Sequence, residues 1–293
     1  MSRRLALLVN PAAAGGKALA AVEPARAELQ RLGADFRVVE TSSGEHAKHE
    51  AKGAAEKGET PVAIGGDGLV GTLAGAIAGS EAELAIVPAG RGNDYARVLG
   101  IPTGPAEAAR LAHEGESKRF DVGDVDGKSF VGIASVGFDS DANRIANEAK
   151  LVRGNLVYAY AALKALAKWK PAHFEVTIDG ERHENTGFTV GVCNSKAYGG
   201  GMKAAPQAVL DDGELDVMFC GEMTKWHFLH TFLPKLFKGT HLEEPSITTF
   251  KGRTIEVRAD RPFVMYADGD PLAELPATVR VSPRALRVIV PKG

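Results

Sequence analysis

Short apolar runs alternate with helical patterns over the first third of the chain. Residues 5–9, 61–64 and 84–87 form continuous apolar segments, as strands buried on both faces of a parallel sheet do. Residues 36–39, Phe-Arg-Val-Val, are predicted as a further strand. Between them, apolar residues recur at helical spacing. This alternation predicts an α/β fold, a Rossmann-like parallel sheet whose ligands bind at the carboxyl ends of the strands.

The pattern changes near residue 119, where β-rich segments replace the alternation. Residues 120–125 and 128–136 are separated by Asp126-Gly127, a typical hairpin turn, and several short strands follow further on. The sequence therefore predicts two domains. We expect an α/β nucleotide-binding domain over residues 1–118 and a β-sandwich domain over residues 119–293, with the last strand packing back on the first domain.

Two helices interrupt the predicted β-sandwich. One long helix is predicted over residues 141–168, and a shorter one over residues 222–238. The shorter helix carries Trp226 and Phe237 beside several lysines. An amphipathic helix that faces the core is the favoured interpretation, and a helix that gives access to lipid is the alternative.

A glycine turn follows the apolar run at residues 61–64. Gly65, Gly66 and Gly68 let the backbone turn sharply, and a helical pattern begins at once. The free N–H groups at the start of that helix suit a phosphate. Asp67 in the turn would repel a phosphate unless a metal ion or a proton lay between them, so we interpret it as a magnesium-side or catalytic carboxylate.

Two other interpretations of this turn remain open. Residues 66–71 satisfy G-x-G-x-x-G, but a dinucleotide fold also needs an acidic residue about 20 positions later, at the end of the next strand. That strand ends in Pro88-Ala89-Gly90 instead. The turn could also be a plain connection without a ligand.

A second glycine turn, Pro88-Ala-Gly-Arg-Gly-Asn-Asp-Tyr-Ala-Arg97, follows the next strand. Together with Gly65-Gly-Asp-Gly68 it resembles the diacylglycerol kinase catalytic domain, whose patterns are GGDGT and P-x-G-T-x-N-D-x-A-R. The resemblance runs from Val9-Asn-Pro11 to Asp268-Gly-Asp270. Leu69 and Arg91 replace the family's threonines, so two hydroxyl contacts to phosphate are missing, and Arg91 could supply a charge instead.

The resemblance to the diacylglycerol kinase catalytic domain implies which residues bind magnesium and ATP. Asp67, Asp94 and Asp121 would orient magnesium and its waters. The expected ATP-binding set is Asn10, Thr41, Gly65, Gly66, Asp67, Gly68, Leu69, Val70, Gly71, Arg91, Asn93, Asp94 and Asp121.

A second metal site is implied at the Asp212-Gly213 turn. In the family such a turn holds a structural magnesium ion, here through the side chain of Asp212 and the carbonyls of Val209 and Glu214. Hard cations do take oxygen sets of this kind. A turn without metal is an equally good interpretation of the residues alone.

The general base is expected at Asp268-Gly269-Asp270. In the resembling kinases a D-G-E element faces the acceptor hydroxyl, and its glutamate accepts the proton; Asp270 holds that position here. Side chains along a strand alternate with a period of two, so Asp268 and Asp270 are expected on one face. Asp268 is the alternative base.

The composition of the chain argues against several classes of partner and of structure. The chain has 293 residues, 44% of them hydrophobic, and a formal net charge of −2, so it lacks the basic field of a nucleic-acid-binding protein. Cys193 and Cys220 are too few for a disulfide framework, and no leader-like apolar run begins the chain. We expect a cytosolic protein with at most peripheral contact to the inner membrane face; a homodimer is compatible with the sequence.

These features predict an ATP- and Mg²⁺-dependent lipid kinase that phosphorylates a hydroxyl of diacylglycerol or a related lipid. Two alternatives remain open. The GGDG element is shared with NAD kinases, so a phosphotransferase of that kind is one. A protein that binds lipid or nucleotide but has lost catalysis is the other, suggested by Leu69, Arg91 and Asp270.

Overall fold

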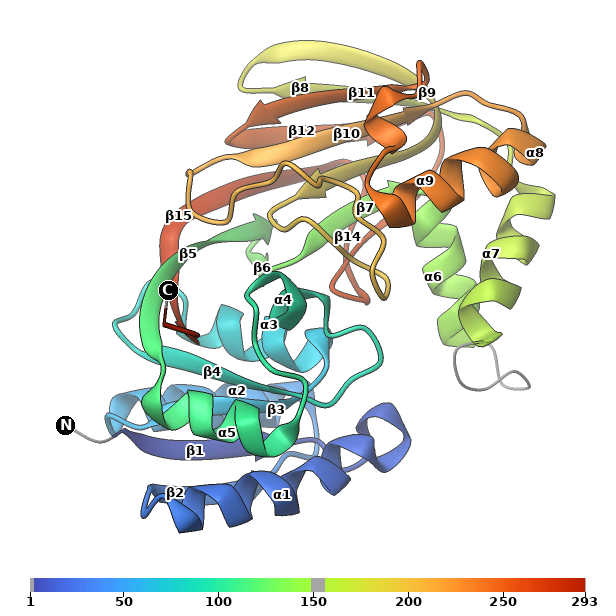
Figure 1. Ribbon diagram of the computed structural model, residues 1–293. Coiled ribbons are helices and arrows are strands. Elements are labelled where there is room, and N and C mark those ends of the chain that lie inside the picture. The colour runs from blue at the N-terminus through green and yellow to red at the C-terminus, as the bar shows by residue number, and fades with distance from the viewer. Residues whose placement is uncertain (1–2, 149–155, 293) are drawn as a thin grey trace.

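The N-terminal half is a parallel sheet at the bottom of Figure 1. The structure, a computed structural model, describes residues 3–148 and 156–292. Four strands pair in the order β4-β3-β1-β2, and their carboxyl ends lie at one edge because Val9 is level with both Glu40 and Ile64. The four predicted strands are confirmed. Their bounds are β1 (Arg4–Val9), β2 (Asp35–Glu40), β3 (Thr60–Gly65) and β4 (Glu83–Pro88).

Helices cover both faces of this sheet, as the alternating pattern predicts. α1 and α5 pack against each other on one face, and α2 packs against α3 on the other. A short helix, α4, follows the second glycine turn. The helices are η1 (Ala13–Gly16), α1 (Lys17–Arg31), α2 (Gly44–Glu56), α3 (Asp67–Ile77), α4 (Asp94–Val98) and α5 (Pro105–Glu114).

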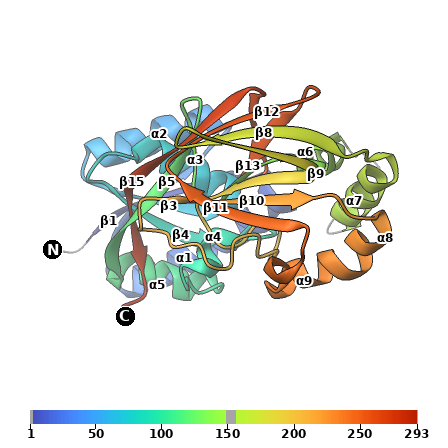
Figure 2. The ribbon, with the colours of Figure 1, turned by 90° about the horizontal axis from the view of Figure 1, so that it is seen from above.

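The C-terminal half is β-rich and antiparallel, which confirms the predicted fold class. Its strands run in the order β14-β13-β7-β9-β8-β12-β15. The first half of β9 pairs with β8 and its second half lies between β7 and β10, so one long strand joins the two parts of the sheet. Seen from above, β8, β10 and β12 lie over the N-terminal layer (Figure 2).

The strands of this half, in chain order, are β5 (Glu116–Val125), β6 (Lys128–Phe130), β7 (Ile133–Gly137), β8 (Ala172–Ile178), β9 (Glu181–Cys193), β10 (Leu215–Gly221), β11 (Ile247–Gly252), β12 (Thr254–Ala259), β13 (Val264–Ala267), β14 (Asp270–Glu274) and β15 (Ala277–Val290).

Asp-Gly pairs make the tight hairpins. Asp126-Gly127 links β5 to β6, as predicted, and Asp179-Gly180 links β8 to β9. Both residues of each pair have positive φ, the left-handed conformation that two-residue hairpin turns require. Asp268-Gly269 forms a third such hairpin between β13 and β14. Asp212-Gly213 is different, because it ends the long loop that leads from β9 into β10.

The single helix predicted over residues 141–168 is wrong. The structure has two helices, α6 (Phe138–Glu148) and α7 (Leu156–Lys168), which pack against each other (Figure 1). Residues 149–155 of that prediction lie outside the described residues. A helical pattern cannot separate one long helix from two that bury similar faces against each other.

The predicted helix near residues 222–238 exists, with an irregular middle. It comprises α8 (Lys225–His227), a π-type turn η2 (Phe228–Phe232) and α9 (Leu233–Lys238), and η3 (His241–Glu243) follows. Pro234 lies in the first turn of α9, where its missing N–H accounts for a change of helical hydrogen bonding. In the described part of the chain, no helix is long and apolar enough to cross a membrane.

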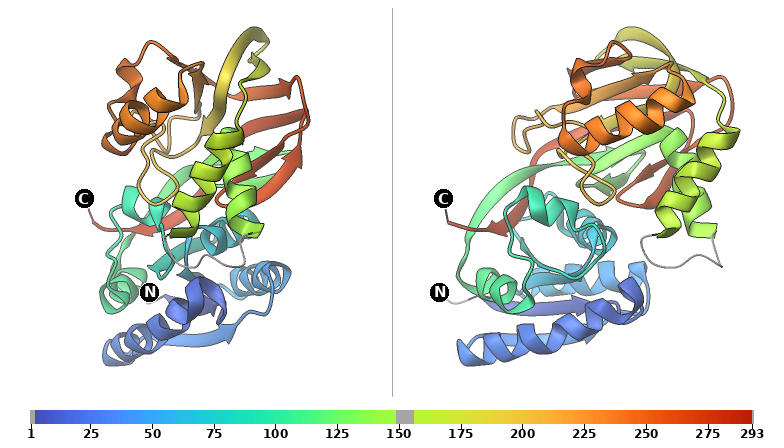
Figure 3. Two further views of the ribbon diagram at one scale, coloured as in Figure 1. Left: turned by 90° about the vertical axis from the view of Figure 1, so that its right-hand side faces the viewer. Right: turned by 45° about the vertical axis from the view of Figure 1, so that its right-hand side comes forward.

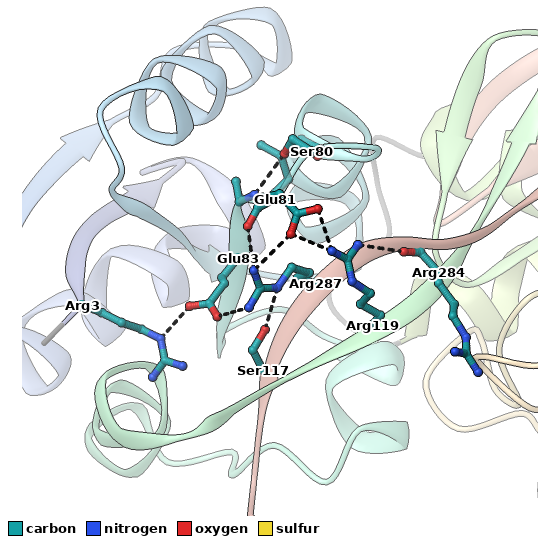
Figure 4. A network of polar contacts seen from close by, with 10 residues as sticks. Arg3, Ser80, Glu81, Glu83, Ser117, Arg119, Arg284 and Arg287 are labelled. Atoms are coloured by element: carbon teal, nitrogen blue, oxygen red, sulfur yellow. Dashed lines mark hydrogen bonds and ion pairs between the residues drawn. The ribbon is translucent and has the colours of Figure 1, made fainter. Parts of the chain in front are cut away.

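The last strand joins the two halves. β15 pairs in parallel with β4 where Arg287 is level with Glu83, and it pairs antiparallel with β5 over most of its length. Arg287 contacts both Glu81 and Glu83. Arg3 also contacts Glu83, and Arg119 contacts Glu81 at the opposite end of the network (Figure 4). These ion pairs fasten the C-terminal strand to the N-terminal sheet.

Candidate active site

Two glycine turns meet at the carboxyl edge of the parallel sheet. The N–H of Ala89 donates to the carbonyl of Gly65 at 2.8 Å, and a Cβ atom on Gly90 would lie 2.3 Å from the Cα atom of Gly66. Only glycines allow the two turns to come this close. Since α3 begins at Asp67, directly after the first turn, the earliest N–H groups of that helix have no intrahelical partner and point out of this edge.

Asp67 and Asp94 face the same small space. Asp67 Oδ1 accepts the Tyr95 N–H at 3.1 Å, and Asp94 Oδ2 accepts the Gly200 N–H at 2.7 Å. A Cβ atom on Gly92 would lie 2.8 Å from Asp94 Oδ2 and 3.1 Å from Asp67 Oδ2, so a glycine there leaves room for both carboxylates. The structure therefore brings two carboxylates from separate turns together.

The environment of Asp94 favours a bound cation. Its burial raises its pKa, the Gly200 N–H opposes this shift, and the nearby charge of Asp67 raises the pKa further. Asp94 Oδ1 is buried and has no hydrogen-bond partner. Among the described residues no cluster of three or more acidic, histidine or cysteine side chains could hold a metal alone. Mg²⁺ is usually bound by one or two carboxylates together with substrate phosphates and water, which fits this pair.

Asp268 is held in place by backbone groups of another segment. Its Oδ2 accepts the Val131 N–H at 2.9 Å and its Oδ1 accepts the Gly132 N–H at 3.0 Å. These two N–H groups are free because the predicted strand at residues 128–136 breaks between β6 and β7. A Cβ atom on Gly71 would lie 2.9 Å from Asp268 Oδ2, so the carboxylate also packs closely on α3.

Asp270 lies in a different environment, two residues further on. Its side chain is exposed, and within residues 3–148 and 156–292 no group donates a hydrogen bond to it. A Cβ atom on Gly68 would lie 3.5 Å from Asp270 Oδ2, so the carboxylate stands over the first turn of α3. Although the side chain reaches solvent, its carboxylate end lies against α3 and is partly desolvated, which raises the pKa of Asp270. Among the described residues, Asp270 is thus a carboxylate without a hydrogen-bond partner beside the glycine turn.

The alternation argument for these two residues is wrong. Asp268 is not on a strand: it is the first residue of the hairpin turn, with φ 53°, and Asp270 begins β14. A left-handed turn residue does not follow the period of two that holds along a strand. Both side chains still approach α3, at Gly71 and Gly68 respectively.

Asp121 is fully buried beside the Asp212 turn. Its Oδ2 accepts the Gly213 N–H at 2.7 Å and its Oδ1 accepts the Arg284 N–H at 2.6 Å. Burial raises the pKa of Asp121, while these two N–H groups lower it. The carboxylate therefore ties the turn to a bulge in β15.

Asp212 carries a lysine partner. Lys251 Nζ lies 2.6 Å from Asp212 Oδ2, and the Glu214 N–H donates to Asp212 Oδ1 at 3.1 Å. The side chain of Val209 is exposed. The ammonium group thus lies against the carboxylate that the family resemblance assigns to a metal ion.

Asn10 and Thr41 shape the ends of their strands. Asn10 Oδ1 accepts the Ala12 N–H at 3.0 Å, and the Thr41 hydroxyl donates to the Val9 carbonyl at 3.2 Å. Thr41 is almost completely buried. In the present conformation both side chains bind backbone close to β1.

The second turn is closed by its own asparagine. Asn93 Oδ1 accepts the Gly90 N–H at 2.8 Å, and Asn93 has φ 53°. Arg91 projects into solvent from the same turn. Leu69 and Val70, which follow the first turn, pack in the N-terminal core.

A cavity of about 310 Å³ opens beside these turns. It lies between the start of α1, the end of β4 and the start of α5. Its walls are mostly small and apolar. The lining residues are Lys17, Ala20, Ala21, Pro88, Ala89, Gly90 and Pro105.

Sequence reasoning missed the backbone donors. Gly200 comes from the long loop between β9 and β10, which descends toward α4 in Figure 1 and reaches Asp94. Gly199, Gly200 and Gly201 all have positive φ, so the run of three glycines was a readable signal of an unusual backbone path. Val131 and Gly132 carried no such signal, because every residue except proline offers the same N–H group.

Two protein-family models match the chain. The diacylglycerol kinase catalytic domain matches residues 4–125, and the YegS C-terminal NAD kinase beta sandwich-like domain matches residues 132–290. The second match spans more than half of the chain. This chain belongs to the family of bacterial diacylglycerol kinases and related lipid kinases.

Two relatives and one solved structure support the same family assignment. The chain is 33% identical to the diacylglycerol kinase of Mycobacterium tuberculosis, over 99% of this chain and 96% of that protein. It is 35% identical to a protein of Pseudomonas aeruginosa named "Probable lipid kinase YegS-like", over 80% and 77%. A crystal structure from Bacillus anthracis strain Sterne, assigned as a diacylglycerol kinase, matches with a TM-score of 0.78 and 25% identity, over 99% and 97%.

Proposed function

We propose that this lipid kinase transfers the γ-phosphoryl group of Mg-ATP to a hydroxyl of diacylglycerol or a related lipid. The observation that carries the proposal is the position of Asp270. Its carboxylate, which has no hydrogen-bond partner in the part of the chain that the structure describes, stands over the first turn of α3, beside a glycine turn that suits phosphates. Phosphoryl transfer requires mainly positioning and charge stabilisation, which these groups can provide.

The start of α3 would hold the phosphates. Its N–H groups at Asp67 and Gly68 lack intrahelical partners and lie at the positive end of the helix dipole. Arg91, exposed on the neighbouring turn, can reach a phosphate oxygen and replace the threonine contact of the family pattern. The cavity beside the two turns, lined by alanines and prolines, offers space for another part of the nucleotide.

Asp67 and Asp94 would hold the magnesium ion. The unpartnered Asp94 Oδ1 and the adjacent Asp67 carboxylate form an oxygen pair that a divalent cation stabilises. Bound Mg²⁺ would neutralise charge on the phosphates during transfer. The Gly200 N–H orients Asp94, and the Tyr95 N–H orients Asp67, so both carboxylates are fixed before substrate binds.

Asp270 would act as the general base. It would accept the proton of the lipid hydroxyl while that oxygen forms a bond to the γ-phosphorus and the bond to the β,γ-bridging oxygen breaks, releasing ADP. Asp268 supports this step indirectly, because its two backbone hydrogen bonds fix the hairpin that carries Asp270.

Nucleotide binding can be tested by thermal unfolding. Mg-ATP at 100 times its dissociation constant should raise stability by about 2.7 kcal/mol, and Gly68→Val should abolish the shift because its methyl groups would fill the space beside Asp270. A wild-type melting temperature that stays unchanged at saturating Mg-ATP would contradict the proposal. Turnover with diacylglycerol and with NAD as acceptors then separates a lipid kinase from an NAD kinase-like enzyme.

A further inference from the structure

The turn at Asp212-Gly213 lies where several segments of the chain meet. It ends the long loop between β9 and β10, and both views of Figure 3 show this loop, in gold, extending from the C-terminal half toward the N-terminal half. Asp121 on β5 binds the turn through the Gly213 N–H, and Lys251 on β11 binds it through Asp212. The turn therefore fixes one end of the loop whose Gly200 reaches Asp94.

Both carboxylate oxygens of Asp212 already have a donor. Lys251 Nζ lies 2.6 Å from Oδ2, and the Glu214 N–H donates to Oδ1 at 3.1 Å. A magnesium ion binds its oxygen ligands at about 2.0–2.1 Å, closer than either donor lies now. An ion at that distance would lie beside the ammonium group, and the two positive charges would repel each other. The residues present therefore do not fit the metal ion that the family resemblance assigns to this turn.

The neighbouring carboxylates are engaged as well. Asp121 uses both of its oxygens to accept backbone N–H groups, and Glu214 Oε2 lies 3.9 Å from the same Lys251 ammonium group. Within residues 3–148 and 156–292, no group of three or more acidic, histidine or cysteine side chains could hold a metal ion. A metal ion at the turn would thus depend on the one carboxylate, that of Asp212, against which the lysine lies.

The position of Lys251 is set by strand pairing. β11 pairs antiparallel with β10, and Lys251 is level with Asp216, so the two side chains project to the same face of the sheet. Asp212, Glu214 and Asp216 follow one another closely in the chain, and their negative charges repel each other unless a positive charge lies among them. Lys251 supplies that charge from a paired strand.

We propose that the ammonium group of Lys251 takes the place of a structural magnesium ion at the Asp212 turn. An ion pair without metal then holds the end of the β9–β10 loop. Lys251 neutralises the carboxylate and joins the turn to β11, while Asp121 joins the turn to β5 and to the bulge in β15. Magnesium that accompanies ATP at Asp67 and Asp94 would be a separate ion.

Thermal unfolding without nucleotide tests the exchange of a metal ion for an ammonium group. Lys251→Ala releases the Asp212 carboxylate, so replacing EDTA with saturating Mg²⁺ should raise its melting temperature by about 2–4 °C more than that of the wild type. Asp212→Asn in the Lys251→Ala background should abolish this additional shift. Lys251→Met, which keeps the apolar stem of the side chain, provides the same test if the alanine variant does not fold.

Lys118 provides a matched control. Its Nζ lies 2.6 Å from Glu116 Oε1, the same separation as in the pair of Lys251 with Asp212, and it also lies on a strand. Lys118→Ala should show the same magnesium-dependent shift as the wild type. A wild-type shift that disappears in Asp212→Asn would overturn the proposal, because magnesium would then bind the turn in the presence of the lysine. The absence of an additional shift in Lys251→Ala would overturn it as well.

Manganese binding gives a readout that depends on neither stability nor kinase activity. Mn²⁺ takes the same kinds of oxygen ligand as Mg²⁺, and electron paramagnetic resonance of the free ion measures how much is bound. Lys251→Ala should bind an Mn²⁺ ion that the wild type does not bind, and Asp212→Asn in the same background should remove it. Equal Mn²⁺ binding by the wild type and Lys251→Ala would contradict the replacement of the metal by the lysine.

Discussion

At the scale of single residues, two carboxylates in one hairpin have opposite environments. Asp268 accepts two backbone hydrogen bonds, whereas Asp270 accepts none among the described residues and stands over Gly68. Burial raises the pKa of Asp268 to about 7, and the N–H groups of Val131 and Gly132 oppose this shift. A carboxylate whose oxygens are both occupied is poorly placed to take a substrate proton, so we assign that role to Asp270.

Removing the base should affect rate and leave stability intact. We expect Asp270→Asn to lower lipid-dependent turnover by at least about a hundredfold, with the melting temperature and the affinity for Mg-ATP almost unchanged. Asp270→Glu should retain substantial activity, because it recreates the acid of the D-G-E pattern. Wild-type turnover should also fall at acidic pH as Asp270, whose pKa is raised by burial, becomes protonated. Steady-state kinetics across pH provide the measurement, and full activity in Asp270→Asn would show that the base lies elsewhere.

Asp268 should behave as a positioning residue. An asparagine would place its NH2 group, a donor, where one of the two accepting oxygens now lies, so one N–H group would lose its partner and Asp268→Asn should lower the free energy of unfolding by about 1–3 kcal/mol. Its turnover should fall as well, because the hairpin that carries Asp270 loosens. Urea unfolding beside kinetics distinguishes the two carboxylates: only the Asp268 variant should lose stability. If Asp268→Asn is as stable as wild type but inactive, Asp268 itself takes the proton.

At the scale of elements, the loop between β9 and β10 connects the C-terminal half to the nucleotide side. Gly200 in this loop donates its N–H to Asp94, and its φ of +84° is one that side chains rarely adopt. The loop is anchored at its base by Tyr198, whose hydroxyl donates to Asp139 at 2.7 Å at the start of α6. A segment of one half therefore orients a carboxylate of the other.

A substitution that strains this loop should weaken the binding of Mg-ATP more than a similar substitution elsewhere. An alanine at position 200 would destabilise the left-handed backbone conformation by about 1–2 kcal/mol. The N–H group would then orient Asp94 less well, so Gly200→Ala should raise the KM for Mg-ATP about tenfold or more. Gly33→Ala is the matched control, because Gly33 also has positive φ and open space around it but lies after α1. Both variants should lose similar stability in thermal unfolding. An equal KM in the two variants would show that the Gly200 contact has no role in binding.

At the scale of the whole molecule, several acids are buried where the sheets and helices pack. Burial raises the pKa of Asp94, Asp121, Asp139, Asp216 and Asp268. In each case the folded state retains a proton at a pH where the unfolded chain has lost it. The free energy of unfolding attributable to these groups should therefore fall as pH rises from about 4 toward about 7.

Asp139 offers a clean test of this pH dependence. Burial raises its pKa to about 6, and an asparagine at this position could still accept the Tyr198 hydroxyl. Asp139→Asn should match wild type near pH 4 and be more stable by up to about 1–3 kcal/mol at pH 8. Urea unfolding at both pH values measures the difference. If Asp139→Asn is equally destabilised at both pH values, the asparagine does not fit at this position. Asp141→Asn, on the same helix, serves as a control.

The sequence by itself determined the parallel strands, the glycine turns and the Asp-Gly hairpins, because each depends on neighbouring residues. The proximity of Asp67 and Asp94 also follows from the predicted sheet, since parallel strands end at one edge of the sheet. Tertiary structure alone decided which groups hold the carboxylates. Asp94 is bound by Gly200, Asp121 by Gly213 and Asp268 by Val131.

The division between α6 and α7, and the exposure of Trp226, were likewise decided by packing. The physical reason is common to these cases. The donors are backbone N–H groups from distant segments, which every residue type but proline offers, and burial of a helix face depends on what packs against it. Such contacts leave no residue pattern to read until the chain has folded.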